Sequence, residues 1–74
     1  MTFAERLKTR RMALQLSQSE LSRASGVGQS QISQYEAGER VPTADTLVAL
    51  ARALSISADW LLGLNDVWSE GLSE

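Results

Sequence analysis

The fold is decided by a stretch in the middle of the chain, GVGQSQISQYEAGERVP, which spans residues 26–42. Two glycines precede a short polar segment and a third follows it, and glycine at such points favours helix ends. The spacing predicts one helix over 29–37 that stops at Gly38. A helix this short is not stable alone, and it is too polar for a core element, so its side chains must serve another purpose.

A second short helix is predicted directly before this one. Ser17 and Glu20 have the spacing of a capping box, and Gly26 is a natural residue for the helix end. Only residues 26–28 connect the two helices, and so short a connection forces their axes to cross steeply, as in a helix-turn-helix. Val27, the one apolar residue of the turn, is expected to lie buried between them.

Side-chain caps and glycine turns place the starts of five helices at Thr2, Ser17, Gln29, Thr43 and Ser57. No strand pattern competes with them. The sequence therefore predicts an all-α, compact five-helix bundle that contains a helix-turn-helix. We expect this domain to occupy residues 1–64, and residues 65–74 to form an acidic C-terminal tail or the start of a linker.

The composition excludes several classes of protein. The chain has 74 residues, no cysteine and no histidine, which excludes disulfides, thiolate metal sites and the usual zinc ligands. No apolar run approaches the roughly 20 residues of a membrane span, and the charged N-terminus is unlike a signal peptide. We expect a cytoplasmic protein without cofactor, metal, small-molecule ligand or membrane partner. Enzymatic activity is not expected, because so small a bundle offers little room for a catalytic pocket.

The net charge of -2 is not typical of a nucleic-acid binder, but the charges are unevenly distributed. All seven basic residues lie between Arg6 and Arg52, whereas three of the nine acidic residues lie in the last nine positions. Four of the cations are close together near the N-terminus: Arg6, Lys8, Arg10 and Arg11. This asymmetry is a weak indication of an anionic partner.

The predicted helix at 29–37 has two different faces. Ile32 and Tyr35 are expected to point toward the body of the protein. The outer face carries four side chains that can bond to base edges: Gln29, Ser30, Ser33 and Gln34. Side chains near the N-terminus of such a helix reach bases when the helix lies in the major groove of DNA. The alternative interpretation of a polar helix face is an ordinary solvated surface.

Arg11 lies on the apolar face of the first predicted helix, because steps of four from Phe3 through Leu7 reach it. A buried arginine requires a partner, and Glu36, one turn beyond Ile32 on the inward side, is the candidate. We expect an Arg11–Glu36 ion pair that ties the first helix to the polar one. The alternative is that Arg11 snorkels at the edge of the core.

The residues alone leave the roles of two further positions open. Gln18 lies beside the unpaired N–H groups and the positive end of the second helix, which suits a phosphate contact, but an exposed helix-forming residue would give the same pattern. Trp60 is expected in the core. Leu61 or Leu62 would then be exposed and would mark a surface for self-association.

Residues 17–54, followed by SADWLLG at 57–63, resemble the helix-turn-helix family of lambdoid phage repressors and Cro proteins. The motifs that carry the resemblance are the SQSEL opening, the GVG turn, the segment ISQYEAG and the segment PTADTL. The resemblance covers roughly residues 3–64. It implies a lambda repressor-like DNA-binding domain of the XRE-like transcriptional regulators, with double-stranded DNA as the partner.

The resemblance also implies roles for individual residues. Base edges would be read by Gln29, Ser30, Ser33 and Gln34. Contacts to the DNA backbone would come from Gln18, Arg11 and Arg40, and Gln18 would also brace Gln29. Arg11 and Glu36 match the family's ion pair. The dimer interface would include Ala58, Leu61 and Leu62.

Two residues depart from the family's usual pattern. Gly28 stands where a Ser or Thr cap is common, at a cost of a few tenths of a kcal/mol in stability. Glu39 stands where a basic or neutral residue is common, and a negative side chain near DNA phosphates is unfavourable. The implied function is a sequence-specific transcriptional regulator, a repressor that binds a palindromic operator as a homodimer through the major groove. A protein-interaction module, and an antitoxin or restriction–modification controller with the same fold, remain as alternatives.

Overall fold

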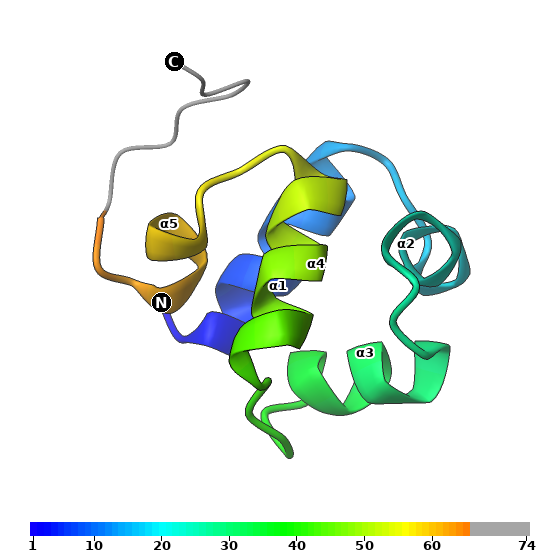
Figure 1. Ribbon diagram of the computed structural model, residues 1–74, viewed down its shortest axis with the longest axis horizontal. Helices are drawn as coiled ribbons and strands as arrows, with labels where there is room; N and C mark the ends of the chain where they lie inside the picture. The colour runs from blue at the N-terminus through cyan, green and yellow to red at the C-terminus, as the bar shows by residue number, and fades with distance from the viewer. Residues whose placement is uncertain (66–74) are drawn as a thin grey trace.

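The computed structural model describes residues 1–65, and this part of the chain is helical without any strand (Figure 1). Five helices follow one another: α1 (Phe3–Ala13), α2 (Gln18–Ser25), α3 (Gln29–Glu36), α4 (Ala44–Leu54) and α5 (Ala58–Leu62). The predicted all-α bundle of five helices is confirmed. The expected tail at 65–74 lies, apart from its first residue, outside the described residues.

Four of the five helices begin at a residue whose side chain caps the first turn, and α3, which begins after Gly28, is the exception. Thr2 Oγ1 accepts a hydrogen bond from the Glu5 amide at 3.2 Å, and the Glu5 carboxylate accepts one from the Thr2 amide at 2.9 Å. Ser17 and Glu20 exchange the same pair of bonds at the start of α2. Each cap satisfies N–H groups that the first helical turn leaves unpaired, and a cap contributes about 1 kcal/mol.

The connection between α2 and α3 produces the steep crossing that its length requires. Figure 1 shows α2 nearly end-on while α3 is seen from the side, along one edge of the molecule. Gly26 ends α2 in the left-handed region, at φ 77°, where a side chain would be strained. Val27 is 7% exposed, and its carbonyl oxygen accepts a hydrogen bond from Ser22 Oγ at 2.6 Å. The burial of the Val27 side chain and the hydrogen bond to its carbonyl oxygen together hold the turn in one conformation.

The core lies between α1, α4 and α5 on one side and α2 and α3 on the other. Helix α1 packs against α3 and α5, and α2 packs against α3 and α4. The rings of Phe3 and Tyr35 meet edge to face, with centroids 6.2 Å apart. The buried apolar residues are Leu7, Leu21, Val27, Ile32, Tyr35, Leu50, Ala51, Leu54, Ile56, Trp60 and Leu61. Since α3 contributes Ile32 and Tyr35 to this core, its opposite face is left outside.

Two of the four clustered N-terminal cations are not on the surface. Arg10 is 1% exposed and Arg6 is 7% exposed, so the expected cationic cluster is reduced to Lys8 and Arg11. The reason is position: Arg10 lies one turn beyond Leu7, on the face of α1 that is buried. Sequence reasoning assigned only Arg11 to that face.

Both buried arginines hold helix ends. Arg10 donates from Nε to the carbonyl oxygen of Leu54 at 2.8 Å and from Nη2 to that of Ser55 at 3.3 Å, where α4 ends. Arg6 donates from Nη1 to the carbonyl oxygen of Trp60 in α5 at 3.0 Å and lies over the Trp60 ring, 4.9 Å from its centroid. A cation at a helix C-terminus satisfies unpaired carbonyls and offsets the helix dipole. Helix α1 therefore fixes the ends of α4 and α5.

Candidate nucleic-acid interface

The outer face of α3 is a row of exposed polar side chains: Gln29, Ser30, Ser33 and Gln34. It is turned outward because Ile32 and Tyr35, at 0% and 2% exposure, are held in the core on the other side of the helix. The side chains of Gln29, Ser30 and Ser33 donate and accept no hydrogen bond within residues 1–65. Their amide and hydroxyl groups are therefore available to a partner that offers hydrogen-bonding groups of its own.

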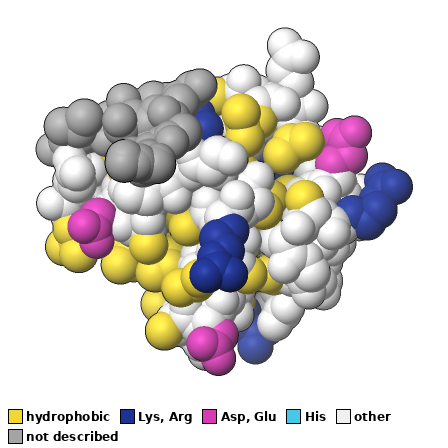
Figure 2. All heavy atoms as spheres, turned by 45° about the horizontal axis from the view of Figure 1, so that its top comes forward, with side chains coloured by type: hydrophobic (Ala, Val, Ile, Leu, Met, Phe, Trp, Pro, Cys, Tyr) yellow, Lys and Arg dark blue, Asp and Glu magenta, His cyan; other side chains and the backbone are white. Residues whose placement is uncertain are grey.

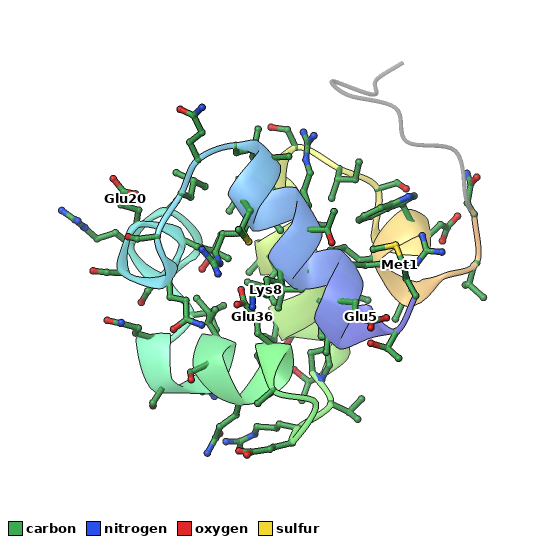
Figure 3. All side chains as sticks on the ribbon, turned by 180° about the vertical axis from the view of Figure 1, so that it is seen from behind. Met1, Glu5, Lys8, Glu20 and Glu36 are labelled. Atoms are coloured by element: carbon green, nitrogen blue, oxygen red, sulfur yellow. The ribbon has the colours of Figure 1, made fainter. Side chains whose placement is uncertain are left out.

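The structure brings Arg11 and Glu36 together in a two-bonded fork between α1 and α3. Arg11 donates from Nε to Glu36 Oε2 at 2.7 Å and from Nη2 to Oε1 at 2.9 Å. Its remaining terminal nitrogen, Nη1, donates to the carbonyl oxygen of Leu16 at 2.7 Å. Figure 3 shows Glu36 between the ribbons of α3 and α1. The side chains of Arg11 and Glu36 are 12% and 5% exposed, so the pair is shielded from water.

These contacts decide the role of Arg11. The hydrogen bond to Glu36 raises the pKa of the Arg11 guanidinium, although desolvation acts against it. All three of its nitrogens are engaged inside the protein. Arg11 thereby anchors α3 to α1. These three bonds use three of the five guanidinium N–H groups, so the expected contact between Arg11 and the DNA backbone stays a prediction.

Gln18 joins the same network. Its Nε2 donates to Glu36 Oε1 at 3.1 Å, so Glu36 accepts from both Gln18 and Arg11. The resemblance implied that Gln18 would brace Gln29, but within residues 1–65 it is bonded to Glu36 instead. One N–H and the carbonyl oxygen of the Gln18 amide are left at the N-terminus of α2. The network ties the start of α2 to the end of α3.

Sequence reasoning missed a contact at the other end of α3. Arg40 donates from Nη1 to Gln34 Oε1 at 2.9 Å. The chain turns back here because Gly38 adopts the left-handed region, at φ 76°, and the Glu39 amide donates to the Gln34 carbonyl oxygen at 2.9 Å. A helix-ending glycine followed two residues later by an arginine was the available signal, since such a turn folds the chain back along the helix.

The interface is only weakly charged. The exposed cations are Lys8, Arg23, Arg40 and Arg52, and the exposed acids within residues 1–65 are Glu5, Glu20, Glu39, Asp45 and Asp59. On the face shown in Figure 2, which turns α3 away from the viewer, the Lys and Arg side chains are separate groups, some of them beside Asp or Glu side chains, and form no continuous patch. The outer face of α3 therefore offers hydrogen-bonding groups more than charge.

The segment expected to form a dimer interface is only partly on the surface. Leu61 is fully buried, at 0% exposure, because it faces the core together with Trp60. Its assignment to the interface is wrong in this structure. Leu62 is 48% exposed and Ala58 is half-buried, so these two remain as candidates. The expectation that Trp60 lies in the core is confirmed by its 4% exposure.

The described part of the chain holds no candidate metal site and no helix that could span a membrane. Residues 1–65 contain no group of three or more acidic, histidine or cysteine side chains that could hold a metal ion. Their helices are too short and too polar for any of them to cross a membrane. The outer face of α3 and the ends of α2 and α3 beside it are therefore the candidate site.

The steep α2–α3 corner, the buried Val27 between the helices and the outward polar face of α3 define a helix-turn-helix domain. A model of the helix-turn-helix family matches residues 7–61 of this chain. The chain belongs to that family.

Curated relatives of known name are similar over most of the chain. Repressor protein C2 of Salmonella phage P22 is 41% identical over 58 residues, which are 78% of this chain and 27% of that protein. The transcriptional repressor RstR of the cryptic phage CTXphi of Vibrio cholerae is 38% identical over 63 residues, 85% of this chain and 56% of that protein. The HTH-type transcriptional regulator YobD of Bacillus subtilis is 38% identical over 64 residues, which are 86% of this chain and 57% of that protein. This chain thus spans between about a quarter and somewhat more than half of these relatives.

Solved structures share the fold. The P22 c2 repressor, in complex with a synthetic operator, superposes with a TM-score of 0.82 at 37% identity, covering 88% of this chain and 98% of that one. The restriction–modification controller protein C.AhdI of Aeromonas hydrophila superposes with a TM-score of 0.78 at 35% identity, covering 81% and 91%. The expected lambda repressor-like fold is confirmed.

Proposed function

We propose that this protein is a sequence-specific DNA-binding transcriptional regulator, a repressor that places α3 in the major groove of its operator. The observation that carries the proposal is the outer face of α3, where four polar side chains project from a helix whose opposite face is locked into the core. Base edges in the major groove present donors and acceptors that amide and hydroxyl groups can match.

The roles of the residues follow from their positions. Base edges would be contacted by Gln29, Ser30, Ser33 and Gln34. Gln18 would contact a phosphate, because it sits beside the N–H groups at the start of α2 and is held there by Glu36. Arg40 would contact a phosphate with the guanidinium N–H groups that it does not donate to Gln34.

The comparisons support this proposal. Two of the named relatives are phage repressors, and the P22 c2 repressor was solved in complex with a synthetic operator. At 37% identity and a TM-score of 0.82, an equivalent docking of α3 is the simplest expectation for this chain. A regulator of this kind acts in the cytoplasm and needs no catalytic site.

We further propose that the protein binds as a homodimer. A two-fold dimer places two copies of α3 about 34 Å apart, one turn of DNA, and recognises a near-palindrome. Leu62, apolar and 48% exposed, and the half-buried Ala58 would contribute to the contact. Dimerisation would double the number of base contacts, which compensates for the weak charge of a single interface.

The similarity to C.AhdI keeps a second regulator class open, a controller of a restriction–modification operon. Both classes read an operator through the same helix. A protein-interaction module that reads no DNA is the alternative from another class. The observation in its support is the small number of exposed cations within residues 1–65.

The test is selection of bound duplexes from a random DNA pool, with the consensus examined for symmetry and half-site spacing. We expect a near-palindrome with half-sites about one helical turn apart. The variant Ser33→Ala should change the consensus, whereas Thr9→Ala, an exposed hydroxyl on α1, should not. Failure of the folded wild-type protein to enrich any sequence would refute DNA reading and favour the protein-interaction module.

A further inference from the structure

We infer that Gln34 and Gln29, although chemically identical, read different bases: Arg40 makes Gln34 prefer a guanine, whereas Gln29 is free to read an adenine. This inference rests on the proposed function and names the specificity of its site. It depends on one contact, the hydrogen bond from Arg40 Nη1 to Gln34 Oε1 at 2.9 Å.

The contact is built into the turn that ends α3. The amide of Ala37 donates to the Ser33 carbonyl oxygen at 3.0 Å, and the amide of Glu39 donates to that of Gln34 at 2.9 Å. Gly38, at φ 76°, permits this reversal, which most side chains would strain. Arg40, two residues after Gly38, is thereby returned to the helical turn that carries Gln34.

The contact changes what the Gln34 amide can offer. A glutamine amide has one oxygen that accepts and an NH₂ group that donates twice. Bidentate recognition of adenine uses both, because adenine presents the N6 donor and the N7 acceptor. Arg40 occupies one of the two lone pairs of the Gln34 oxygen, so Gln34 presents chiefly its two N–H donors. Guanine, whose N7 and O6 are both acceptors, is the base edge that suits two donors.

Charge acts in the same direction. The Arg40 guanidinium carries a positive charge and lies against the Gln34 oxygen. It attracts the two acceptors of a guanine edge and disfavours the approach of the adenine N6 donor to that oxygen. Arg40 is therefore a positioning residue for specificity, in addition to its proposed phosphate contact.

Gln29 provides the internal comparison. Its side chain is exposed and makes no hydrogen bond within residues 1–65, so both halves of its amide are available. It can adopt the bidentate arrangement that suits adenine. Helix α3 thus presents two glutamines, one whose amide oxygen is bonded to Arg40 and one whose amide is not bonded within residues 1–65.

The experiment compares base preferences after selection from a random DNA pool. The variant Gln34→Ala identifies the base pair that Gln34 faces, because discrimination is lost there. At that pair we expect the wild-type protein to favour guanine over adenine about tenfold. In Arg40→Ala the preference should fall to parity or reverse toward adenine, while the pair faced by Gln29 keeps its preference.

The matched control is Arg52→Ala, which removes an exposed arginine from α4 and should leave every base preference unchanged. Because Arg40 is exposed, its replacement is expected to leave the melting temperature nearly unchanged, which thermal unfolding checks.

Three results would overturn the inference: an adenine preference of the wild-type protein at the pair faced by Gln34, a consensus that Gln34→Ala leaves intact, or a guanine preference that survives in Arg40→Ala. The last result would reduce Arg40 to a phosphate contact. If the wild-type protein enriches no sequence, the proposed function itself fails, and this outcome is distinct from the other three.

Discussion

Arg10 Nε donates a hydrogen bond to the carbonyl oxygen of Leu54 over 2.8 Å, across 44 positions of sequence. Arg10 is fully buried, and the same guanidinium reaches the carbonyl oxygen of Ser55, which ends α4 in the left-handed region at φ 51°. In a domain this small, a buried charge at a helix end replaces part of the apolar core that the chain is too short to build. Through this contact α1 is bonded directly to the C-terminal end of α4.

Replacement of Arg10 by alanine is expected to lower the free energy of unfolding by about 2 to 4 kcal/mol, because packing is lost and the carbonyls of α4 lose their donor. Urea denaturation measures the change. Arg10→Met retains much of the packing, so the difference between the two variants reports the hydrogen bonds. Lys8→Ala, an exposed change on the same helix, should stay within about 0.5 kcal/mol of wild type. Equal stabilities of Arg10→Ala and wild type would contradict the role assigned to this arginine.

Replacement of Glu36 by alanine should destabilise the fold by about 2 to 4 kcal/mol, since it leaves Arg11 largely buried without its carboxylate. Thermal and urea unfolding measure the effect. The double variant Arg11→Met with Glu36→Ala should recover part of the loss, because no unpaired charge then remains. A melting temperature of Glu36→Ala equal to that of wild type would show that the fork contributes nothing.

Replacement of Gln29 by alanine is expected to relax discrimination at one or two operator positions, with a loss of about 1 to 3 kcal/mol there. The reason is that its exposed amide is the group proposed to contact a base edge. Binding to a panel of single-base operator variants measures this. The stability of the fold should not change, and an unchanged binding profile across the panel would remove Gln29 from the reading face.

The start of α2 should loosen in acid. The pKa of Glu20 is lowered mainly by the hydrogen bond from the Ser17 amide, and further by a hydrogen bond with the Ser17 side chain. A carboxylate whose pKa is lower in the folded state stabilises that state above the unfolded pKa, and the contribution is lost as the pH falls. We expect the protection of the Ser17 amide against exchange, relative to its intrinsic rate at each pH, to fall as the pH drops below the ordinary glutamate value of about 4.3. In Glu20→Gln this protection should no longer depend on pH, and an unchanged dependence would exclude Glu20 as its source.

The affinity for DNA should respond only moderately to salt. Log affinity falls with log salt by about 0.9 for each neutralised phosphate, and each subunit exposes four cations: Lys8, Arg23, Arg40 and Arg52. The slope should therefore not exceed about 4 per subunit, and Arg40→Ala should lower it by about 1. Binding measured from low to physiological salt checks this. A steeper slope would require a further cation, Arg6, Arg10 or Arg11, to reach the DNA.

Local signals predicted most of the fold. The caps at Thr2, Ser17, Thr43 and Ser57 mark helix starts in the structure, because a cap depends only on residues within one turn of it. The helix-turn-helix was predictable for a similar reason, since three residues leave the chain few ways to turn. The partnership of Arg11 with Glu36 was expected from helical spacing, which places both on inward faces.

What the sequence did not reveal depends on contacts between distant elements. Helical spacing from Leu7 leads to Arg10 as well as to Arg11, but only the position of the ends of α4 and α5 explains why two further arginines are buried. The same holds for Leu61 and Leu62, because the orientation of α5 about its own axis decides which of the two leucines is buried. The pairing of Arg40 with Gln34 depends on the path of the chain after Gly38.

The burial of Arg6 and Arg10 has a consequence for how such a regulator would work in a cell. Every genome offers a vast excess of random sites that compete with the operator through their phosphates. A protein that hides two of its cations adheres less to this background, so a smaller share of its molecules is sequestered. Few copies per cell would then suffice to keep an operator occupied.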